Sequence, residues 1–529
     1  MLILRTFRSV FTARRCLPLL LLISLLVVYG CAVNPVTGKT ELTLISEAGE
    51  INIGEENYLF SRQGQGGQYS IDPGLTAYVN SIGKSLAAMS DRPHLPYEFV
   101  VINNSVPNAW ALPGGKIAVN RGLLLELESE AELAAVLAHE IVHAAARHGA
   151  KGVERGLVLQ TGLIGVGLAA SKSSYRDLAV GAASVGTALV SKKYSRNAEL
   201  EADFYGMKYM ALAGYDPEAA VALQKTFVRL SEKRQSNWLS GLFASHPPSR
   251  ERVDANRATA GTLARGGRVG AKEYKQKIRR LAATKEAYKE HDRGRALLAE
   301  SKGEAALRAA ERAIAKEPGE ALFYGLKGDV RATQKRYREA EKYYNEAIKL
   351  NGNYYQLFLQ RGLVREKLGN PQGAGSDLRR STTLYPTAYA FNSLGNLALA
   401  AGERRAAMKH FSMAASSNSA VGKNARIAFA RLDLPGRPER YLDVRFARNR
   451  GGYVVVILNN RSPVSVKEVL VTVKHHDERG RILEEDTISF RSVLEPGGNA
   501  ARVTPVGPLG DEKSLGRIQG KIAGANVVD

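Results

Sequence analysis

The segment His139-Glu140-Ile141-Val142-His143 places two imidazoles four residues apart, with a carboxylate beside the first of them. On an α-helix, residues four apart lie on one face, so both imidazoles can bind one metal ion. Glu140 would then lie beside the metal rather than on it, where it can take a proton from an attacking water and pass it to a leaving amine. The spacing therefore indicates a catalytic zinc site with hydrolytic chemistry.

The residues around this segment predict the helix that the site requires. Ser129 and Glu132 have the spacing of a capping box, an apolar stripe runs from Leu133 to Ile141, and Gly149 is typical of a helix end. His148 lies five positions after His143 and would point to a different face. We therefore interpret His148 as a partly charged cap of the helix C-terminus and not as a metal ligand.

A catalytic zinc ion needs a third protein ligand and an open fourth position, and a second acidic segment offers one. Asn197 can cap a helix on which Glu199 and Asp203 share one face, while Glu201 is rotated by about 200°. We predict that Glu199 is the third ligand. Asp203 would stand beside it and orient a ligand imidazole through its other ring nitrogen.

These residues resemble the zinc metallopeptidase family of the CaaX prenyl protease and the HtpX heat-shock protease, which pairs HExxH with a downstream ExxxD. The segments 213–217 and 245–252 resemble the family's helix junction and its HPP-containing segment, and the likeness covers residues 40 to 260. The resemblance implies endopeptidase activity, one Zn²⁺ per chain bound by His139, His143 and Glu199, and Glu140 as the general base.

The segment 108–117 resembles the family's strand and turn ahead of the zinc helix. In zinc peptidases such a strand pairs with the extended backbone of the substrate. The residues expected to form this substrate strand are Asn108, Ala109, Trp110 and Ala111.

For two further residues, His246 and Arg252, the sequence leaves more than one role possible. His246 could polarise the scissile carbonyl, bind the zinc ion and close its fourth position, or only cap the turn before Pro247. Arg252 could serve the oxyanion or form an ion pair. A zinc-bound His246 would make a self-blocked resting enzyme.

The N-terminus predicts export. Four arginines precede an apolar run from Leu17 to Tyr29, which has the length of a signal peptide and is short for a membrane span. The residues up to Cys31 resemble a bacterial lipobox, although Tyr29 is larger than usual there. We expect residues 1–30 to be removed and Cys31 to carry lipid on the periplasmic side of the envelope. By resemblance to enterobacterial lipoproteins, the absence of Asp at position 32, which is Ala, favours the outer membrane. An uncleaved anchor is the alternative, with the same topology.

The chain of 529 residues is too long for one hydrophobic core. Glycines 294, 328, 362 and 395 recur at the tetratricopeptide period of about 34 residues, although an unrelated helical bundle is the alternative. Short alternating segments after Tyr441 predict strands at 453–458, 468–474, 487–490 and 501–504. The predicted fold is multidomain: a mainly α zincin-type metallopeptidase domain with a small sheet (31–260), a linker and capping helix (261–290), an α-solenoid of about four tetratricopeptide repeats (291–430) and a β-sandwich-like domain (439–529).

Two Gly- and Ala-rich apolar stretches, 157–170 and 178–190, separate the predicted zinc ligands. They are short for spanning helices. They would form a hydrophobic loop that shields the site or touches lipid or unfolded client, or else a buried hairpin.

The formal net charge of +22 is concentrated in residues 261–438, which carry +17. A basic groove there would attract acidic protein segments or anionic headgroups, although scattered charges on solvated helix faces explain the count equally well. Nucleic acid is not an expected partner of an exported lipoprotein.

The combined pattern predicts a zinc-dependent endopeptidase of the bacterial cell envelope that acts in quality control or assembly of outer-membrane or periplasmic proteins. Its substrates would be unfolded or misassembled envelope proteins, and the repeats would hold the client or an assembly machine. The alternative is a chaperone or scaffold lipoprotein with a latent or self-blocked metal site. The complete set of ligands and general base in the sequence argues against that alternative.

Overall fold

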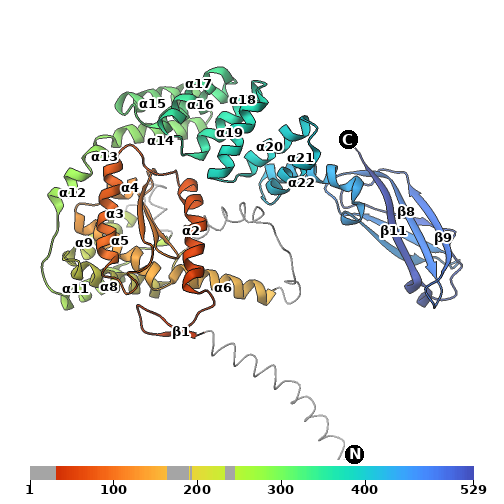
Figure 1. The fold of residues 1–529 in the computed structure, drawn as a ribbon, viewed down its shortest axis with the longest axis horizontal. Helices are drawn as coiled ribbons and strands as arrows, with labels where there is room; N and C mark the ends of the chain where they lie inside the picture. Colours follow the sequence, from red (N-terminus) through yellow and green to blue (C-terminus); the bar gives the residue numbers. More distant parts are fainter. Residues whose placement is uncertain (1–30, 164–189, 191–192, 233–244, 529) are drawn as a thin grey trace, which may run out of the picture. The chain divides into compact units, whose positions relative to one another are not determined.

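The computed structural model describes residues 31–163, 190, 193–232 and 245–528 (Figure 1). The chain divides into two compact units, Met1–Leu368 and Gly369–Asp529. The predicted signal segment and most of the two apolar stretches lie outside the described residues. None of the helices within the described ranges is both long and apolar enough to cross a lipid bilayer.

The first unit begins with a short hairpin and continues as a mainly helical region around one small sheet. Its elements up to the repeats are β1 (Cys31–Val33), β2 (Thr40–Leu42), α2 (Glu47–Gly64), α3 (Pro73–Ala87), β3 (Glu98–Ile102), β4 (Ala109–Leu112), β5 (Lys116–Asn120), α4 (Arg121–Leu124), α5 (Glu130–Ala145), α6 (His148–Leu163), α8 (Arg196–Leu212), α9 (Glu218–Glu232), α11 (Arg250–Thr262), α12 (Ala271–Lys277) and α13 (Arg279–Ala283). Asp72 caps α3, since its side chain accepts from the backbone N–H of Leu75.

The sheet has the order β3-β5-β4, so β4 lies at an edge. Strand β5 runs parallel to β3 and antiparallel to β4, with Ala109 opposite Val119 and Leu112 opposite Lys116. The turn between β4 and β5 needs glycine, because Gly114 has a φ of +78° and a Cβ there would lie 2.7 Å from the Cα of Ile51. The segment that was expected to receive substrate is thus an edge strand.

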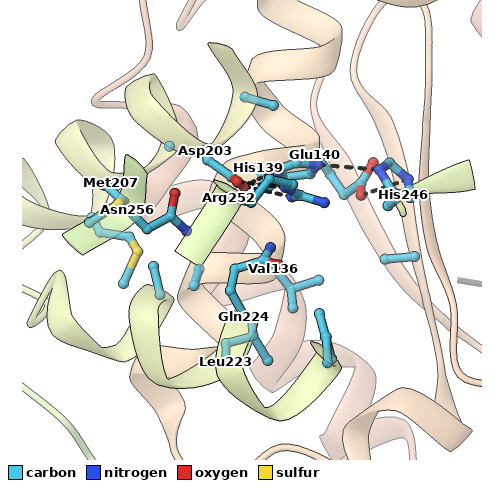
Figure 2. A pocket seen from close by; sticks show the side chains of 17 residues that line it. Val136, His139, Glu140, Asp203, Met207, Leu223, Gln224, His246, Arg252 and Asn256 are labelled. Carbon is cyan, nitrogen blue, oxygen red and sulfur yellow. Dashed lines mark hydrogen bonds and ion pairs between the residues drawn. The ribbon is translucent and has the colours of Figure 1, made fainter. Parts of the chain in front are cut away.

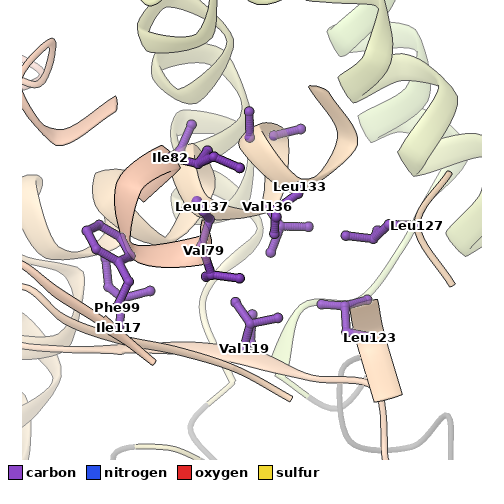
Figure 3. Packing of buried hydrophobic residues seen from close by; sticks show 14 of the residues in the cluster. Val79, Ile82, Phe99, Ile117, Val119, Leu123, Leu127, Leu133, Val136 and Leu137 are labelled. Carbon is purple, nitrogen blue, oxygen red and sulfur yellow. The ribbon is translucent and has the colours of Figure 1, made fainter. Parts of the chain in front are cut away.

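Both faces of this sheet are buried. Phe99 and Ile117 belong to the large apolar cluster that includes Val79 of α3 and Leu137 of α5 (Figure 3). The alternate residues of the strands, such as Val100, point to the opposite face and pack with side chains of α2. The sheet therefore supports α5 from one side, and every residue of α5 is buried.

Helix α5 ends earlier than the sequence suggested. It was expected to run to Gly149, but it stops at Ala145, and Arg147 has a left-handed φ of 63° before α6 begins. A left-handed arginine is strained. Its guanidinium offsets that cost, because it binds Glu50, donates to Thr43 Oγ1 at 2.8 Å and also reaches the carbonyl of Ile45.

Helix α8 packs closely against α5. The predicted cap Asn197 is wrong, since Ser195 is the extended residue before the helix and its Oγ accepts from the backbone N–H of Ala198 at 3.3 Å. A Cβ on Gly206 would lie 3.1 Å from the backbone nitrogen of His139, so glycine allows the two helices to approach at the predicted metal site.

The rest of the first unit consists of paired helices. They are α14 (Lys285–Ala299), α15 (Gly303–Lys316), α16 (Ala321–Thr333), α17 (Tyr337–Leu350) and α18 (Tyr355–Lys367). Gly294 and Gly328 lie where helices cross, because a Cβ on either would come within 2.6 Å of Leu326 or Tyr344. Small residues at such crossings allow the paired helices of a repeat to pack closely. Asn103 of the sheet region donates to Glu320 at 3.0 Å and ties it to these helices.

The second unit continues with helices and ends in strands. Its elements are α19 (Pro371–Leu384), α20 (Ala388–Ala400), α21 (Arg404–Ala415), α22 (Ala420–Asp433), β6 (Leu442–Arg448), β7 (Val454–Asn460), β8 (Val466–His476), β9 (Ile482–Phe490), β10 (Asn499–Val503) and β11 (Ile518–Val527), with short 3₁₀ turns between them. Two three-stranded sheets, β10-β7-β6 and β11-β8-β9, share one apolar core. The predicted fold class is confirmed, although strands β6 and β11 were not foreseen.

Candidate metal centre

Helices α5 and α8 and the segment before α11 bring four candidate ligands together. His139, His143, Glu199 and His246 each offer one ligand atom, and these atoms all lie within 4.8 Å of one another. The Nε2 atoms of His139 and His143 are 3.0 Å apart, and His246 Nδ1 lies 3.3 Å from His139 Nε2. Glu199 Oε1 lies 3.1 Å from His246 Nδ1 and 3.5 Å from His143 Nε2.

These separations fit a tetrahedral zinc ion. Bonds of about 2.0–2.1 Å to a central ion give ligand-to-ligand distances of about 3.3 Å. The charges fit as well. Among the described residues, Arg252 contacts the carboxylates of Glu199 and Asp203, and Glu140 lies 3.5 Å from His246. Three carboxylates and one guanidinium leave two negative charges, which a divalent cation would neutralise when the imidazoles that bind it are uncharged. Nitrogen and oxygen donors in this number are those that zinc takes in proteins.

Glu140 lies beside the cluster and not in it. It is 2% exposed, its Oε1 lies 3.5 Å from His246 Nε2, and its Oε2 has no hydrogen-bond partner within the described ranges. Burial raises the pKa of Glu140, while nearby His246 and His139 oppose that rise. An otherwise unpartnered carboxylate oxygen at this point is suited to accept a proton.

His139 is oriented by a carboxylate that is itself fixed in place. Its Nδ1 lies 2.9 Å from Asp203 Oδ1, which leaves Nε2 directed at the cluster. Burial alone would lower the pKa of His139, but hydrogen bonds with Asp203 and Glu199 outweigh it and raise this pKa to about 10. The role proposed for Asp203 from its spacing agrees with this geometry.

Arg252 forms the ion pair that was one of its two expected roles. It donates from Nε and Nη2 to the two oxygens of Asp203, each at 2.7 Å (Figure 2). Its Nη1 lies 2.9 Å from Glu199 Oε2. Burial would raise the pKa of Asp203, but Arg252 lowers it. One guanidinium thus holds two carboxylates of α8.

His148 corrects the interpretation made from the sequence. It was expected to cap a helix on another face, yet its Nδ1 lies 2.8 Å from the Nδ1 of His143. The break at Arg147 ends α5 before His148 and lets the imidazole come back toward this ring. Glu201, which is not in the cluster, lies 3.3 Å from His148 Nε2.

Tyr194 is a residue near the site that sequence reasoning missed. Its ring stacks on that of His143, with centroids 3.8 Å apart and planes 16° apart. Its backbone N–H also donates to the carbonyl of Ser245, next to His246. No motif could have indicated this contact, because it depends on how the start of α8 crosses α5.

The predicted substrate strand divides between two faces. Ala109 lines a cavity of about 40 Å³ together with His139, Glu140 and apolar residues of α8 and α9 (Figure 2). Trp110 points to the opposite face and packs edge-on against Tyr58 at 6.5 Å. Asn108 and Ala111 are both buried, and Cys31, the predicted lipidation site, begins β1.

Two family models match the chain. Peptidase family M48 matches residues 73–260, and the tetratricopeptide repeat matches residues 291–354. The first range contains all four candidate ligands, Glu140 and Arg252.

Several characterised proteins are similar to this chain. A putative β-barrel assembly-enhancing protease of Vibrio cholerae is 32% identical over 36% of this chain and 40% of its own length. The mitochondrial metalloendopeptidase OMA1 of Arabidopsis thaliana is 34% identical over 32% of this chain and 33% of its own length. The chain thus spans less than half of these two relatives. The β-barrel assembly-enhancing protease of Escherichia coli (strain K12) is 29% identical over 64% of this chain and 75% of its own length.

Solved structures also resemble part of the chain. MamA, whose crystal structure is known, is 20% identical in sequence. The match covers 28% of this chain and 86% of the MamA chain, and the two superpose with a TM-score of 0.24. That score is too low to support any inference. The family matches and the clustered ligands lead to one assignment: residues 73–260 are a peptidase family M48 domain with a candidate metal site, and residues 291–354 match the tetratricopeptide repeat.

Proposed function

We propose that this protein is a zinc-dependent endopeptidase of the bacterial cell envelope. The observation that carries the proposal is the buried carboxylate of Glu140 beside a cluster of three imidazoles and one carboxylate. The similarity to the β-barrel assembly-enhancing protease of Escherichia coli supports a role in quality control or assembly of outer-membrane or periplasmic proteins. The substrates would be unfolded or misassembled envelope proteins.

His139, His143 and Glu199 would hold one zinc ion, which supplies polarisation of the scissile carbonyl and a lowered pKa of the attacking water. Glu140 takes the proton of that water at its free Oε2 as the new C–O bond forms. It then gives the proton to the amine nitrogen as the C–N bond breaks, so that the products are a free carboxylate and a free amine. Strand β4, at the sheet edge, would hold the substrate backbone in extended form.

His246 would close the site at rest. Its Nδ1 is within 3.3 Å of both His139 Nε2 and Glu199 Oε1, the position expected of a fourth ligand, and a fourth protein ligand leaves no open place for substrate. Activity would then require displacement of His246. On this proposal His246→Ala raises the rate of cleavage.

The remaining proposals concern place and partners. Cys31 would carry a lipid that anchors the mature chain, on the periplasmic side and at the outer membrane. The repeats would bind the client or an assembly machine. A chaperone or scaffold with a latent site is the competing function, and the complete ligand set with its general base argues against it.

The test uses purified residues 32–529 with their bound metal. An unfolded casein is the substrate, and wild type is compared with Glu140→Gln, with Glu98→Gln as a control on an exposed carboxylate of the sheet. We expect cleavage to fall at least about 100-fold in Glu140→Gln, the usual contribution of a general base, and to be unchanged in the control. An unchanged rate in Glu140→Gln would refute the proposal.

A further inference from the structure

The ring of His143 is held on the side away from the ligand cluster by a second imidazole. His143 Nδ1 lies 2.8 Å from His148 Nδ1, and His148 Nε2 lies 3.3 Å from Glu201 Oε2. Lys39 Nζ lies 3.3 Å from the other oxygen of Glu201. His143 and His148 are 1% and 6% exposed, so water does not replace these contacts.

Only one arrangement of protons satisfies all three groups. An imidazole that offers Nε2 to a metal keeps its proton on Nδ1 and needs an acceptor for it. The acceptor at His143 is the Nδ1 of His148, which can accept when His148 carries its proton on Nε2. That second N–H then points at the carboxylate of Glu201, so Glu201 selects the tautomer that His148 needs.

The loop that carries His148 is fixed by the N-terminal part of the described chain. The side chain of Asn34, 2% exposed, donates to the carbonyl of Ala146 at 3.1 Å. Arg147, next along the loop, binds Glu50 and donates to Thr43. Residues 34 to 50 thus surround the residues immediately before His148 and hold them in the left-handed turn.

We propose that His148 is a positioning residue for the metal ligand His143, that Glu201 fixes its tautomer, and that residues 34–50 hold the loop that presents it. The proposal rests on the proposed zinc peptidase function. It assigns the two helix imidazoles different supports: His139 is held by the carboxylate of Asp203, and His143 by a neutral imidazole backed by a carboxylate. It also makes the N-terminal hairpin, β1 and β2, part of the support of the metal site.

The experiment measures zinc affinity by competition with a chromogenic chelator in the full mature chain. His148→Ala should bind zinc about 10–100-fold more weakly, the usual cost of losing such a partner. His148→Gln should recover most of this loss, because its amide can accept from His143 and donate to Glu201. The zinc affinity of Glu201→Ala should lie between those of His148→Ala and His148→Gln. The control is His94→Ala, which should bind zinc as tightly as wild type, because His94 is exposed and pairs only with Glu47 among the described residues.

A cobalt-substituted sample separates a positioning role from direct ligation. At saturating Co²⁺, the visible d–d bands of His148→Ala should match those of wild type, because the ligands themselves are unchanged. Altered bands would mean that His148 binds the metal, and would overturn the proposal. Wild-type zinc affinity in His148→Ala would overturn it as well.

If His148→Ala does not fold, His148→Gln and Glu201→Ala decide the matter, and equal affinity of Glu201→Ala and wild type would refute the proposed tautomer control. Zinc binding by wild type distinguishes failure of the proposed function from failure of the His148 role. If wild type binds no zinc and shows no Glu140-dependent cleavage, the proposed function falls and this inference with it. If wild type does both and the His148 variants bind zinc as tightly, only this inference falls.

Discussion

Among the described residues, Arg252 is the guanidinium that contacts the buried carboxylates of Glu199 and Asp203, so its removal tests the charge balance directly. In Arg252→Met the aliphatic volume is largely kept, but Asp203 loses two hydrogen bonds of 2.7 Å and Glu199 loses a cation at 2.9 Å. Arg252 is 4% exposed, so water does not take its place. The variant therefore leaves Asp203 Oδ2 buried without the hydrogen bond that Arg252 donates, while Asp203 Oδ1 keeps its contact with His139.

The expected cost follows from measurements on other buried pairs. Removing one partner of such a pair costs about 3–5 kcal/mol. A domain of 150–250 residues loses about 2–4 °C in its unfolding midpoint per kcal/mol, so the midpoint should fall by roughly 6–20 °C. The loss should be larger in metal-free protein than in zinc-loaded protein, because a divalent cation compensates the same carboxylates.

Scanning calorimetry on zinc-loaded and chelator-treated samples measures both values. The matched control is Arg196→Met, because Arg196 of α8 pairs with Glu251 of α11 and so joins the same two helices as Arg252 and Asp203, but at the surface. We expect no measurable change in the control, since exposed pairs are screened by water and salt. A fall of less than about 2 °C in metal-free Arg252→Met would refute the charge-balance argument.

Three further outcomes follow from the described contacts. The pKa of Asp203 is held below its ordinary value of 3.8 by its guanidinium partner, so its carboxylate stabilises the fold above about pH 4 and that contribution is lost as the pH falls through the lower folded pKa. Asp203→Asn should therefore lower the unfolding midpoint at neutral pH, with a difference from wild type that shrinks in acid; a difference independent of pH would contradict this. Glu199→Ala should lose stoichiometric zinc by elemental analysis, while Glu201→Ala should retain it at saturating zinc, and the reverse result would show that the wrong carboxylate was chosen. Gly328→Ala should cost about 1–3 kcal/mol in urea unfolding, because its Cβ would lie 2.6 Å from the ring of Tyr344; a stabilised variant would mean that the helices separate freely.

Much of the metal centre could be predicted because helix geometry fixes which residues share a face. His139 and His143, and likewise Glu199 and Asp203, are four residues apart, and the structure brings both pairs to one point. The position of His246 could be foreseen only as a set of alternatives, since no periodic pattern links it to the helices.

The support around the ligands could not be predicted in the same way. Arg147 adopts a left-handed backbone that a non-glycine residue takes only when distant contacts hold it, and those contacts come from residues about a hundred positions earlier. Without that break His148 would face elsewhere. The stacking of Tyr194 likewise arises from tertiary packing.

The strand-rich part shows the same limit. Strand β11 contains Gly520 and Gly524, which weaken any strand pattern in the sequence. Its pairing makes sense only in three dimensions, because a Cβ on Gly520 would lie 2.4 Å from the ring of Phe446 in β6. Gly520 thus permits this close packing, although glycine disfavours a strand by its own propensity.

If one zinc ion is held by the ligands of α5 and α8, metal analysis and zinc X-ray absorption on purified residues 32–529 will detect it and its neighbours. We expect one zinc per chain with only nitrogen and oxygen neighbours at about 2.0–2.2 Å, and with fewer imidazole neighbours in His246→Ala. Absence of stoichiometric zinc from protein reconstituted with the metal, or an unchanged spectrum in Glu199→Ala and His246→Ala, would contradict it.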